Sequence, residues 1–348
     1  MDVLKRAALV VVLGSACVPT LEDRSSLVSA PRVLAVAATP AEAPPGATVT
    51  YAALYADPAG GGSSAPAEWD FCDDPASLDQ SEPVSPRCFA ASGAWLVPIG
   101  DGSTVTGPLP DDGCRLFGPT PPDPMPGQPA PRPVDPDATG GYYQPLRLAV
   151  TTSAASEYVM FRDRITCGVS GATREQSADY TSRIRPNVNP LVMSLVDMTT
   201  GSAVSLDDGS APLPVHAGQT LSLRVSWPAC PSTGVCGDGI CGDDETDTLC
   251  SADCATPKGC AGAEHFVLFD LASRSVVRAR EGIRVSWFAT AGDFAQERTA
   301  APADPAAPSS SDNAWTAPAT PGDVRLWVTL RDDRGGAGWQ SYRLSVGN

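Results

Sequence analysis

The residues best suited to chemistry are gathered between Cys230 and Cys260. Six of the chain's 11 cysteines lie in this segment, and glycines and acidic residues separate them. A segment with so few large apolar side chains cannot bury a hydrophobic core of its own. Covalent or ionic cross-links must therefore hold it in shape. Its side chains could supply disulfides, a zinc site or a calcium site.

The cysteine spacing is compatible with two of these chemistries. Cys236 and Cys241 enclose four residues, and Cys250 and Cys254 enclose three, which would suit zinc in a cytosolic protein. The N-terminal secretory signal described below favours disulfides instead, because exported proteins meet an oxidising environment. We therefore predict that the segment is held by three disulfides.

The connectivity stays open at this point, because six cysteines can pair in many ways. Cys230 and Cys260 flank the predicted strands that lead into and out of the segment, so their disulfide would close its base. The pairs that we favour in the whole chain are Cys72–Cys88, Cys114–Cys167, Cys230–Cys260, Cys236–Cys250 and Cys241–Cys254.

The acidic residues of the same segment suggest a calcium site. Ca²⁺ prefers carboxylate and carbonyl oxygens on a loop that can fold around the ion. The candidate ligands are Asp238, Asp243, Asp244, Asp247 and Asp253. Their spacing is not that of an EF-hand loop, because no glutamate follows at the required offset. The alternative is an acidic loop that is simply solvated.

Signs of catalysis are sparse, and we predict no catalytic residue. The chain has 2 histidines, His216 and His265, and neither lies in a recognisable motif. The segment Gly168–Gly171 lacks one spacer of Gly-x-Ser-x-Gly, and neither His-Glu-x-x-His nor a phosphate-binding loop occurs. The alternative is an anchored or secreted hydrolase of carbohydrate or peptide, whose site is assembled from residues distant in the sequence.

The charge balance excludes some classes of partner. The net charge is -16 at pH 7 and the isoelectric point is about 4.4. A chain this acidic is repelled by nucleic acids and by anionic lipid surfaces. We therefore expect no nucleic-acid partner, and a membrane contact would need a covalent lipid.

The N-terminus predicts export and lipidation. Lys5 and Arg6 precede a short apolar run, and Gly14-Ser-Ala-Cys17 then resembles a lipoprotein cleavage site, although leucine is usual at the position of Gly14. We predict a signal peptide over 1–16, a lipid on Cys17 and a tether over 17–30. The alternative is ordinary cleavage near residue 16. Without Cys17, ten cysteines remain, an even number that is compatible with five disulfides. The residue after Cys17 is Val18 and not the aspartate that can retain lipoproteins at an inner membrane, so we favour the outer membrane.

The remaining chain predicts an all-β protein made of two tandem immunoglobulin-like sandwiches. Abundant Pro and Gly separate short apolar strands. A turn followed by an alternating strand occurs at 44–56 and again at 215–227; a strand precedes each, and an aromatic strand (68–71 and 264–270) follows. The first domain would cover 31–186, with a solvated Pro-rich loop at 108–137. The second would cover 187–348, with the disulfide-rich acidic insert at 230–260.

Smaller signals complete this prediction. Thr173 and Gln176 form a capping box for a helix that ends near Ile184. Asp332-Asp-Arg-Gly-Gly336 predicts a hairpin turn between the last two strands. Four tryptophans, at 69, 227, 287 and 327, fall on predicted strands and are assigned to the cores. Trp315 and Trp339 lie nearer to loops and are candidates for exposed recognition.

Several of these pieces occur together in a known group of proteins. They are the lipoprotein signal, Trp69-Asp-Phe-Cys72, Asp135–Pro145, Cys236-Gly-Asp-Gly-Ile-Cys241, Trp287–Gly292, Trp315–Pro318 and Leu330–Gly336. In this combination the chain resembles myxobacterial surface lipoproteins that join immunoglobulin-like or PKD-like modules to a Cys-Gly-Asp-Gly-x-Cys repeat. The resemblance implies location and fold, and it transfers no catalytic residue.

Together these signals predict a lipid-anchored, extracytoplasmic, non-enzymatic protein. Its expected role is binding, adhesion or structure at the cell envelope, with an unidentified protein or carbohydrate partner.

Overall fold

The computed structural model describes residues 24–348 except 59–66, 77–82, 122, 128–131, 133, 136, 152–155, 231–232, 238–240, 243–244, 246–247 and 255–258. The predicted signal peptide, Cys17 and the beginning of the predicted tether lie outside the described residues. Among the residues that are described, no helix is both long enough and apolar enough to cross a bilayer.

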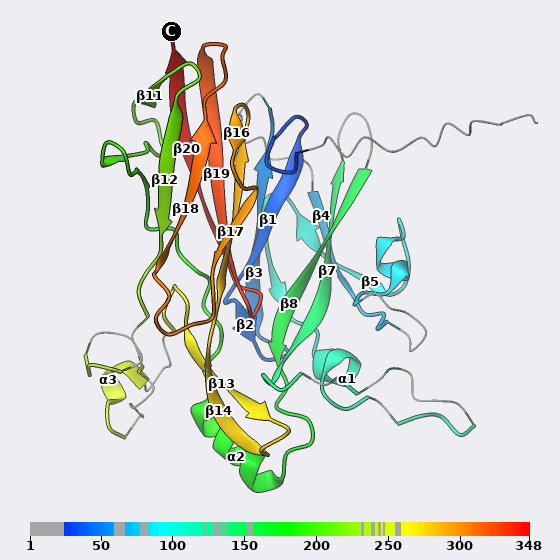
Figure 1. Ribbon diagram of the computed structural model, residues 1–348. Coiled ribbons are helices and arrows are strands. Elements are labelled where there is room, and N and C mark those ends of the chain that lie inside the picture. Colours follow the sequence, from blue (N-terminus) through cyan, green and yellow to red (C-terminus); the bar gives the residue numbers. More distant parts are fainter. Residues whose placement is uncertain are drawn as a thin grey trace, which may run out of the picture.

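The first half of the chain forms two facing sheets (Figure 1). One has three strands, in the order β1 (Arg32–Thr39), β3 (Thr48–Ala56) and β6 (Thr104–Pro108). The other has five, in the order β2 (Glu42–Ala43), β8 (Ser156–Thr166), β7 (Gly141–Thr151), β4 (Ala67–Cys72) and β5 (Leu96–Asp101). The core between them contains the aromatic side chains of Tyr51, Trp69, Phe71 and Tyr142.

The second half forms two further sheets of five strands each. One has the order β10 (Ser202–Ala203), β9 (Ser194–Asp197), β12 (Thr220–Ser226), β18 (Ser310–Thr316) and β16 (Asp293–Phe294). The other has the order β11 (Leu213–His216), β20 (Ala337–Gly347), β19 (Gly322–Asp332), β15 (Ile283–Ala289) and β17 (Arg298–Ala301). Trp227, Trp287, Trp315 and Tyr342 lie in the core between these sheets.

The two halves share one strand order. In each half a short strand pairs in parallel with the last long strand, β2 with β8 and β11 with β20. The antiparallel neighbours then follow in the same sequence in both sheets. No sheet of the described residues combines strands from both halves. Two facing sheets with this order define an immunoglobulin-like sandwich, and the predicted all-β fold class is confirmed.

One predicted correspondence between the halves is wrong. The sequence predicts that the aromatic strands 68–71 and 264–270 occupy the same position in the two sandwiches. In the shared strand order, however, the strand equivalent to β4 is β15. Residues 265–270 instead form β13 (His265–Asp270), which pairs only with β14 (Ser275–Arg280) in a separate hairpin. This hairpin projects below the second sandwich in Figure 1. An aromatic, alternating strand fits both environments, so the sequence pattern alone does not distinguish them.

The short helices match the sequence in part. The predicted capping box is present at α2 (Arg174–Arg183), where the Gln176 N–H donates to Thr173 Oγ1 at 3.2 Å and the Thr173 N–H donates to Gln176 Oε1 at 2.8 Å. The sequence predicts that the Pro-rich loop 108–137 is solvated, and this is wrong for part of the loop. It contains α1 (Gly113–Phe117), and Leu109 is buried in the first core. The disulfide between Cys114 and Cys167 ties α1 to the residue that follows β8.

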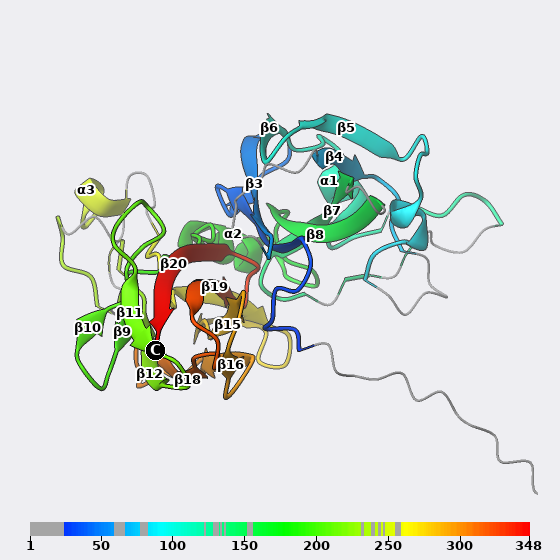
Figure 2. The ribbon, with the colours of Figure 1, turned by 90° about the horizontal axis from the view of Figure 1, so that it is seen from above.

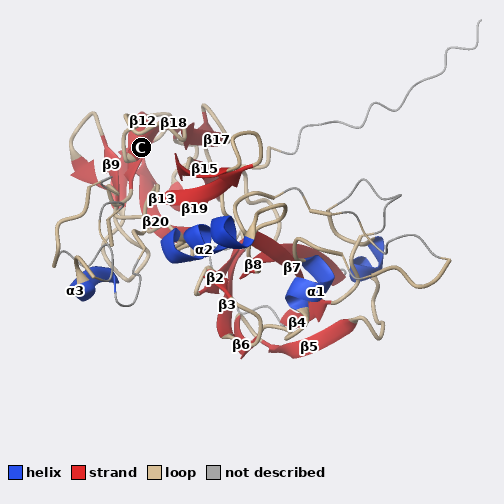
Figure 3. Ribbon diagram, turned by 90° about the horizontal axis from the view of Figure 1, so that it is seen from below, coloured by secondary structure: helices blue, strands red, loops and turns tan. Residues whose placement is uncertain are grey.

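An apolar junction joins the two sandwiches, which lie side by side when viewed from above (Figure 2). Leu54 and Ala56 project from the face of β3 opposite to Tyr51. They belong to one cluster with Val28, Leu34, Ala35 and Trp327. β3 therefore contributes to two cores, one on each face. The helix α2 lies apart from this junction, beside the β13–β14 hairpin at the bottom of Figure 1, and faces the viewer when the molecule is seen from below (Figure 3).

The predicted tether is wrong for its described part, residues 24–30. Val28 is fully buried in the junction. Its N–H donates to the carbonyl of Ala289 at 2.9 Å, and the Ala289 N–H donates to the carbonyl of Ser26 at 2.9 Å. The Ser25 hydroxyl donates to Glu297 at 2.5 Å. Burial of Val28 and these exchanged hydrogen bonds hold the segment against β15 instead of leaving it free.

Candidate functional site

The cysteine-rich insert follows β12 and precedes the β13–β14 hairpin. It contains the short helix α3 (Ser251–Cys254). The ten cysteines after Cys17 are all paired, as Cys72–Cys88, Cys114–Cys167, Cys230–Cys260, Cys236–Cys250 and Cys241–Cys254. These are the five pairs favoured from the sequence. Because the sulfurs are consumed in disulfides, thiolate ligands for zinc are not available in the insert.

The predicted calcium ligands are only partly described. Asp238, Asp243, Asp244 and Asp247 lie outside the described residues. Asp253 is buried, and the Gly237 N–H donates to its carboxylate. Glu245, which the sequence analysis did not include, accepts the Gly242 N–H at 2.7 Å. Asp253 and Glu245 offer oxygens within 4.8 Å of each other, beside the Cys236–Cys250 disulfide.

The calcium hypothesis makes a direct prediction. Millimolar Ca²⁺ should raise the thermal midpoint of the oxidised protein above its value in EDTA, because a ligand that binds the native state stabilises it. Glu245→Gln should abolish the shift, whereas the exposed control Glu68→Gln should leave it unchanged. Equal midpoints in EDTA and Ca²⁺ for the wild-type protein would identify the insert as an acidic loop held by disulfides alone.

A buried charge cluster lies where the two halves and the base of the insert meet. We define it as six residues that are each at most 5% exposed, namely Glu42, Arg164, Glu264, Glu281, Asp332 and Arg334. Glu42 and Arg164 come from the first half, and their ion pair measures 2.9 Å. Arg334, in the β19–β20 turn, pairs with Glu281 at 2.6 Å and with Glu264 at 2.7 Å.

Hydrogen bonds from Asn187 and from the Cys260 backbone connect this cluster to its surroundings. The Asn187 N–H donates to Glu42 at 3.0 Å, and the Asn187 amide donates to both oxygens of Asp332 at 3.2 Å. The Cys260 N–H donates to Glu264 at 2.6 Å, so the disulfide at the base of the insert lies next to the cluster. The cluster therefore links both sandwiches, the segment between them and the insert.

Burial controls the protonation of the cluster. It raises the pKa of Glu281 to about 8 and that of Glu264 to about 7, although Arg334 acts in the opposite direction on both. Burial also raises the pKa of Asp332. For Arg334, burial disfavours the charge, but Glu281 and Glu264 outweigh it and raise the pKa. Four carboxyl groups thus share the guanidinium groups of Arg164 and Arg334. Glu281 and Glu264, whose pKa values are raised, retain protons near neutral pH.

This arrangement predicts a pH dependence of stability. Glu281 and Glu264 have folded-state pKa values of about 8 and 7, above the ordinary 4.5. The folded protein therefore holds protons that the unfolded chain releases, and the free energy of unfolding falls as pH rises. We expect a loss of several kcal/mol between pH 5 and 9, because each pKa unit of difference between the folded and unfolded states is worth about 1.4 kcal/mol. Urea midpoints across this range measure it.

The matched variants for this pH series are Glu281→Gln and Glu68→Gln. The first replaces a fully buried carboxyl and should flatten the pH profile, because an amide has no proton to lose in this range. The second changes an exposed side chain and should leave the profile unchanged. Identical profiles for wild type and Glu281→Gln would show that this cluster does not control the pH dependence.

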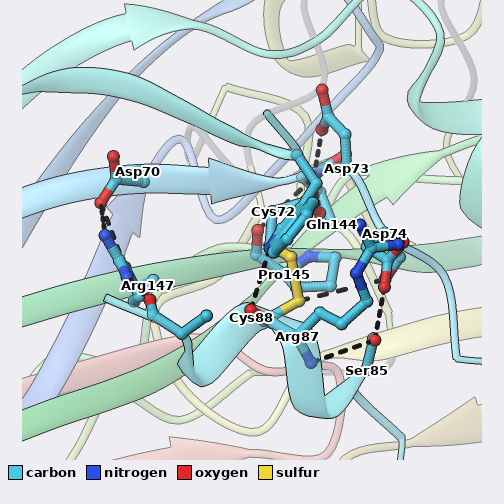
Figure 4. Close-up of a disulfide and its surroundings, with 12 residues drawn as sticks. Asp70, Cys72, Asp73, Asp74, Ser85, Arg87, Cys88, Gln144, Pro145 and Arg147 are labelled. Atoms are coloured by element: carbon cyan, nitrogen blue, oxygen red, sulfur yellow. Dashed lines mark hydrogen bonds and ion pairs between the residues drawn. A yellow bond between two sulfur atoms is a disulfide. The ribbon is translucent and has the colours of Figure 1, made fainter. Parts of the chain in front are cut away.

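A second feature is the strap, which we define as residues 83–95. It covers part of the sheet face that points away from the first core (Figure 4). The disulfide between Cys72, at the end of β4, and Cys88, in the short 3-10 helix η1 (Pro86–Phe89), fixes the strap. Arg147 donates to the Ala90 carbonyl and pairs with Asp70 at 2.6 Å.

Further contacts make the strap rigid. The Ser85 hydroxyl donates to Asp74 at 2.5 Å, and Arg87 pairs with the same carboxylate at 2.8 Å. The Arg87 guanidinium lies 3.6 Å from the ring centroid of Trp95, and the Trp95 indole N–H donates to the Arg87 carbonyl at 2.9 Å. The strap is thus held at both ends and along its length.

A pocket of about 550 Å³ lies between the strap and β8. Its lining residues are Pro83, Val84, Pro86, Phe89, Met160 and Arg162. Five of the six are apolar, and Arg162 supplies the only formal charge. This pocket was not predicted from the sequence. Met160 and Arg162 alternate along β8, which indicates a shared face, but nothing in the sequence links that face to residues 83–89.

The residues singled out as candidates from the sequence lie in separate places. His216 ends β11, with its Nδ1 3.1 Å from the Asn348 carbonyl oxygen, and His265 begins β13. Trp315 was predicted to be exposed, and this is wrong, because it is fully buried on β18. Trp339 is half-buried against the junction. Neither tryptophan provides an open recognition surface.

The core predictions for the other tryptophans hold. Trp69, Trp227 and Trp287 are buried within the sandwiches. Trp327 is buried as well, but in the junction between the two halves.

Neither the fold class nor the function of the chain rests on its similarity to known proteins. No family model matches the sequence, and no curated protein matches it. Among solved structures, the chain is similar to the fibronectin(III)-like modules of Clostridium thermocellum CbhA, with 11% identity and a TM-score of 0.19 over 91% of this chain and 93% of that chain. It is also similar to the Yersinia pseudotuberculosis adhesin InvE, with 11% identity and a TM-score of 0.21 over 90% of this chain and 58% of that chain. Scores this low carry no argument about function, and the fold class rests on the strand order.

Proposed function

We propose that this chain is a non-catalytic binding or structural protein of the cell envelope, anchored through a lipid on Cys17. The observation that carries the proposal is the pairing of ten cysteines in five disulfides. Such a set is stable in oxidising compartments and is rare in the cytosol. It supports an extracytoplasmic location, and the signal sequence with its cysteine supports the anchor and the outer membrane.

The non-catalytic part of the proposal rests on the state of the titratable groups. Raised pKa values often mark active sites. Here burial raises the pKa values of Glu281, Glu264 and Asp163 well above the ordinary range. All three are buried: Arg334 forms ion pairs with Glu281 and Glu264, and the Tyr51 hydroxyl donates to Asp163. Groups of this kind stabilise a fold and are not accessible to a substrate. The rigid junction and strap suit a protein that presents surfaces in fixed positions.

The anchor is tested with the full chain in a Gram-negative host. Cells are fed an alkyne-tagged fatty acid, and the chain is compared with its Cys17→Ser variant for labelling and for flotation with outer-membrane vesicles. The proposal expects labelling and flotation of the wild type alone. A labelled Cys17→Ser chain, or an unlabelled wild type, contradicts it. Resistance of both chains to a thiol-reactive polyethylene glycol before reduction checks export independently.

A further inference from the structure

We propose that the pocket beneath the strap binds an amphiphile with one negative charge, namely an apolar chain of about medium-chain fatty-acid size that ends in a carboxylate. This inference deepens the proposed binding role by naming a site and a ligand class. It does not depend on the lipid anchor.

The walls of the pocket select an apolar ligand. Pro83, Val84 and Pro86 come from the strap, and Met160 comes from β8. A volume of about 550 Å³ is within the usual range for small-molecule sites, which are mostly apolar with few polar groups. The unbranched side chain of Met160 can adapt to an aliphatic chain. Phe89 lines the pocket and is 47% exposed, so its ring is open to contact with an apolar ligand.

The pocket is largely preformed. The Cys72–Cys88 disulfide and the Asp74 contacts to Ser85 and Arg87 fix the strap over the sheet (Figure 4). A ligand that enters a rigid pocket does not have to order it, so less of the interaction energy is lost on binding.

Arg162 selects the charge of the ligand. Three arginines project from this face of β7 and β8, as the strand register places them. Arg147 forms an ion pair with Asp70, and Arg164 forms an ion pair with Glu42. Arg162 lies against the ring of Tyr143, with 4.4 Å between the guanidinium and the ring centroid, and forms no ion pair with a carboxylate of the described residues. An exposed guanidinium held in this way beside an apolar cavity is complementary to a carboxylate head group.

The test uses the full oxidised chain with Cys17→Ser, which removes only the proposed lipid site. Binding of decanoate and of neutral 1-decanol is measured by isothermal titration. We expect both to bind. Arg162→Gln should weaken decanoate binding roughly tenfold and leave decanol binding unchanged. Met160→Trp, which fills the pocket, should abolish both. The control Arg284→Gln alters an exposed arginine on the second sandwich and should change neither.

Other outcomes overturn the proposal. If wild type binds neither probe, or if Met160→Trp and Arg162→Gln bind both probes as wild type does, the pocket is not the site. Met160 packs against the apolar cluster of Cys72, Val84, Cys88 and Leu96 that lies under the strap, whereas Phe89 does not belong to it. Phe89→Ala therefore provides a second variant that leaves this cluster intact, and it should weaken the binding of both probes.

Discussion

Replacing Arg334 with leucine is expected to lower the free energy of unfolding by about 3–5 kcal/mol. The reason is that the guanidinium is 3% exposed and pairs with Glu281 and Glu264, which are also buried. Without it, these carboxyls keep their desolvation cost and lose their counter-ion. Urea unfolding followed by tryptophan fluorescence measures the effect at pH 9, above the pKa values of Glu281 and Glu264, and the loss should be smaller at pH 6, where both carboxyls hold protons.

Two further variants separate this cause from general damage to the turn. Arg284→Leu removes an exposed ion pair to Asp333 and should cost at most about 1 kcal/mol. Adding Glu281→Gln to Arg334→Leu should recover part of the lost stability, because one uncompensated carboxyl is removed. If Arg334→Leu proves no more harmful than Arg284→Leu, the buried charge cluster does not hold the two halves together.

Removing the disulfide between Cys114 and Cys167 is the second change with a large expected effect. The two cysteines are separated by 53 residues, and closing a loop of that length restricts the unfolded chain by about 4 kcal/mol. The same bond fixes α1 against the first sandwich, whose core Cys114 and Cys167 border. A double Cys114→Ala, Cys167→Ala chain should therefore show a lower main unfolding midpoint in urea.

The matched control is the Cys236–Cys250 disulfide, with a separation of 14 residues. Its residues belong to neither sandwich core. Its removal should loosen the insert locally, as detected by faster proteolysis there, and leave the main urea midpoint unchanged. A main transition that falls equally in both double variants would show that the insert unfolds together with the sandwiches.

The sequence predicts most of the strands, because alternating apolar residues mark a half-buried strand wherever the buried face is apolar. Ile283, Val285 and Trp287 on β15 are of this kind, and all are buried. β18 shows where the rule fails. Its buried face consists of Ser311, Asn313 and Trp315, and the polar pair is satisfied by hydrogen bonds to Thr299 and Gln296. A buried face that is mostly polar gives no apolar alternation, so the sequence places Trp315 near a loop instead of in the core.

The candidate sites were less predictable than the strands. Disulfide pairs could be inferred because the sequence predicts export, and cysteine has few roles in an exported chain. The buried charge cluster could not, because Asp332-Asp-Arg-Gly-Gly336 has the composition of a solvent-exposed turn. Only its tertiary environment buries it, because Glu42 comes from the first half of the chain and Glu264 and Glu281 flank the β13–β14 hairpin. The pocket depends likewise on a strap and a strand that the sequence does not connect.

The docking of residues 24–28 on β15 has a consequence for the order of assembly. Ser25 and its partner Glu297 are 272 residues apart, and the strand that Val28 joins belongs to the second sandwich. A chain exported with its N-terminus first can close the sheets of the first sandwich as soon as β8 emerges. Its leading segment, however, must wait until the second sandwich has arrived. If the chain is exported N-terminus first, as the proposed location requires, the part that enters the new compartment first would therefore be among the last to reach its native contacts.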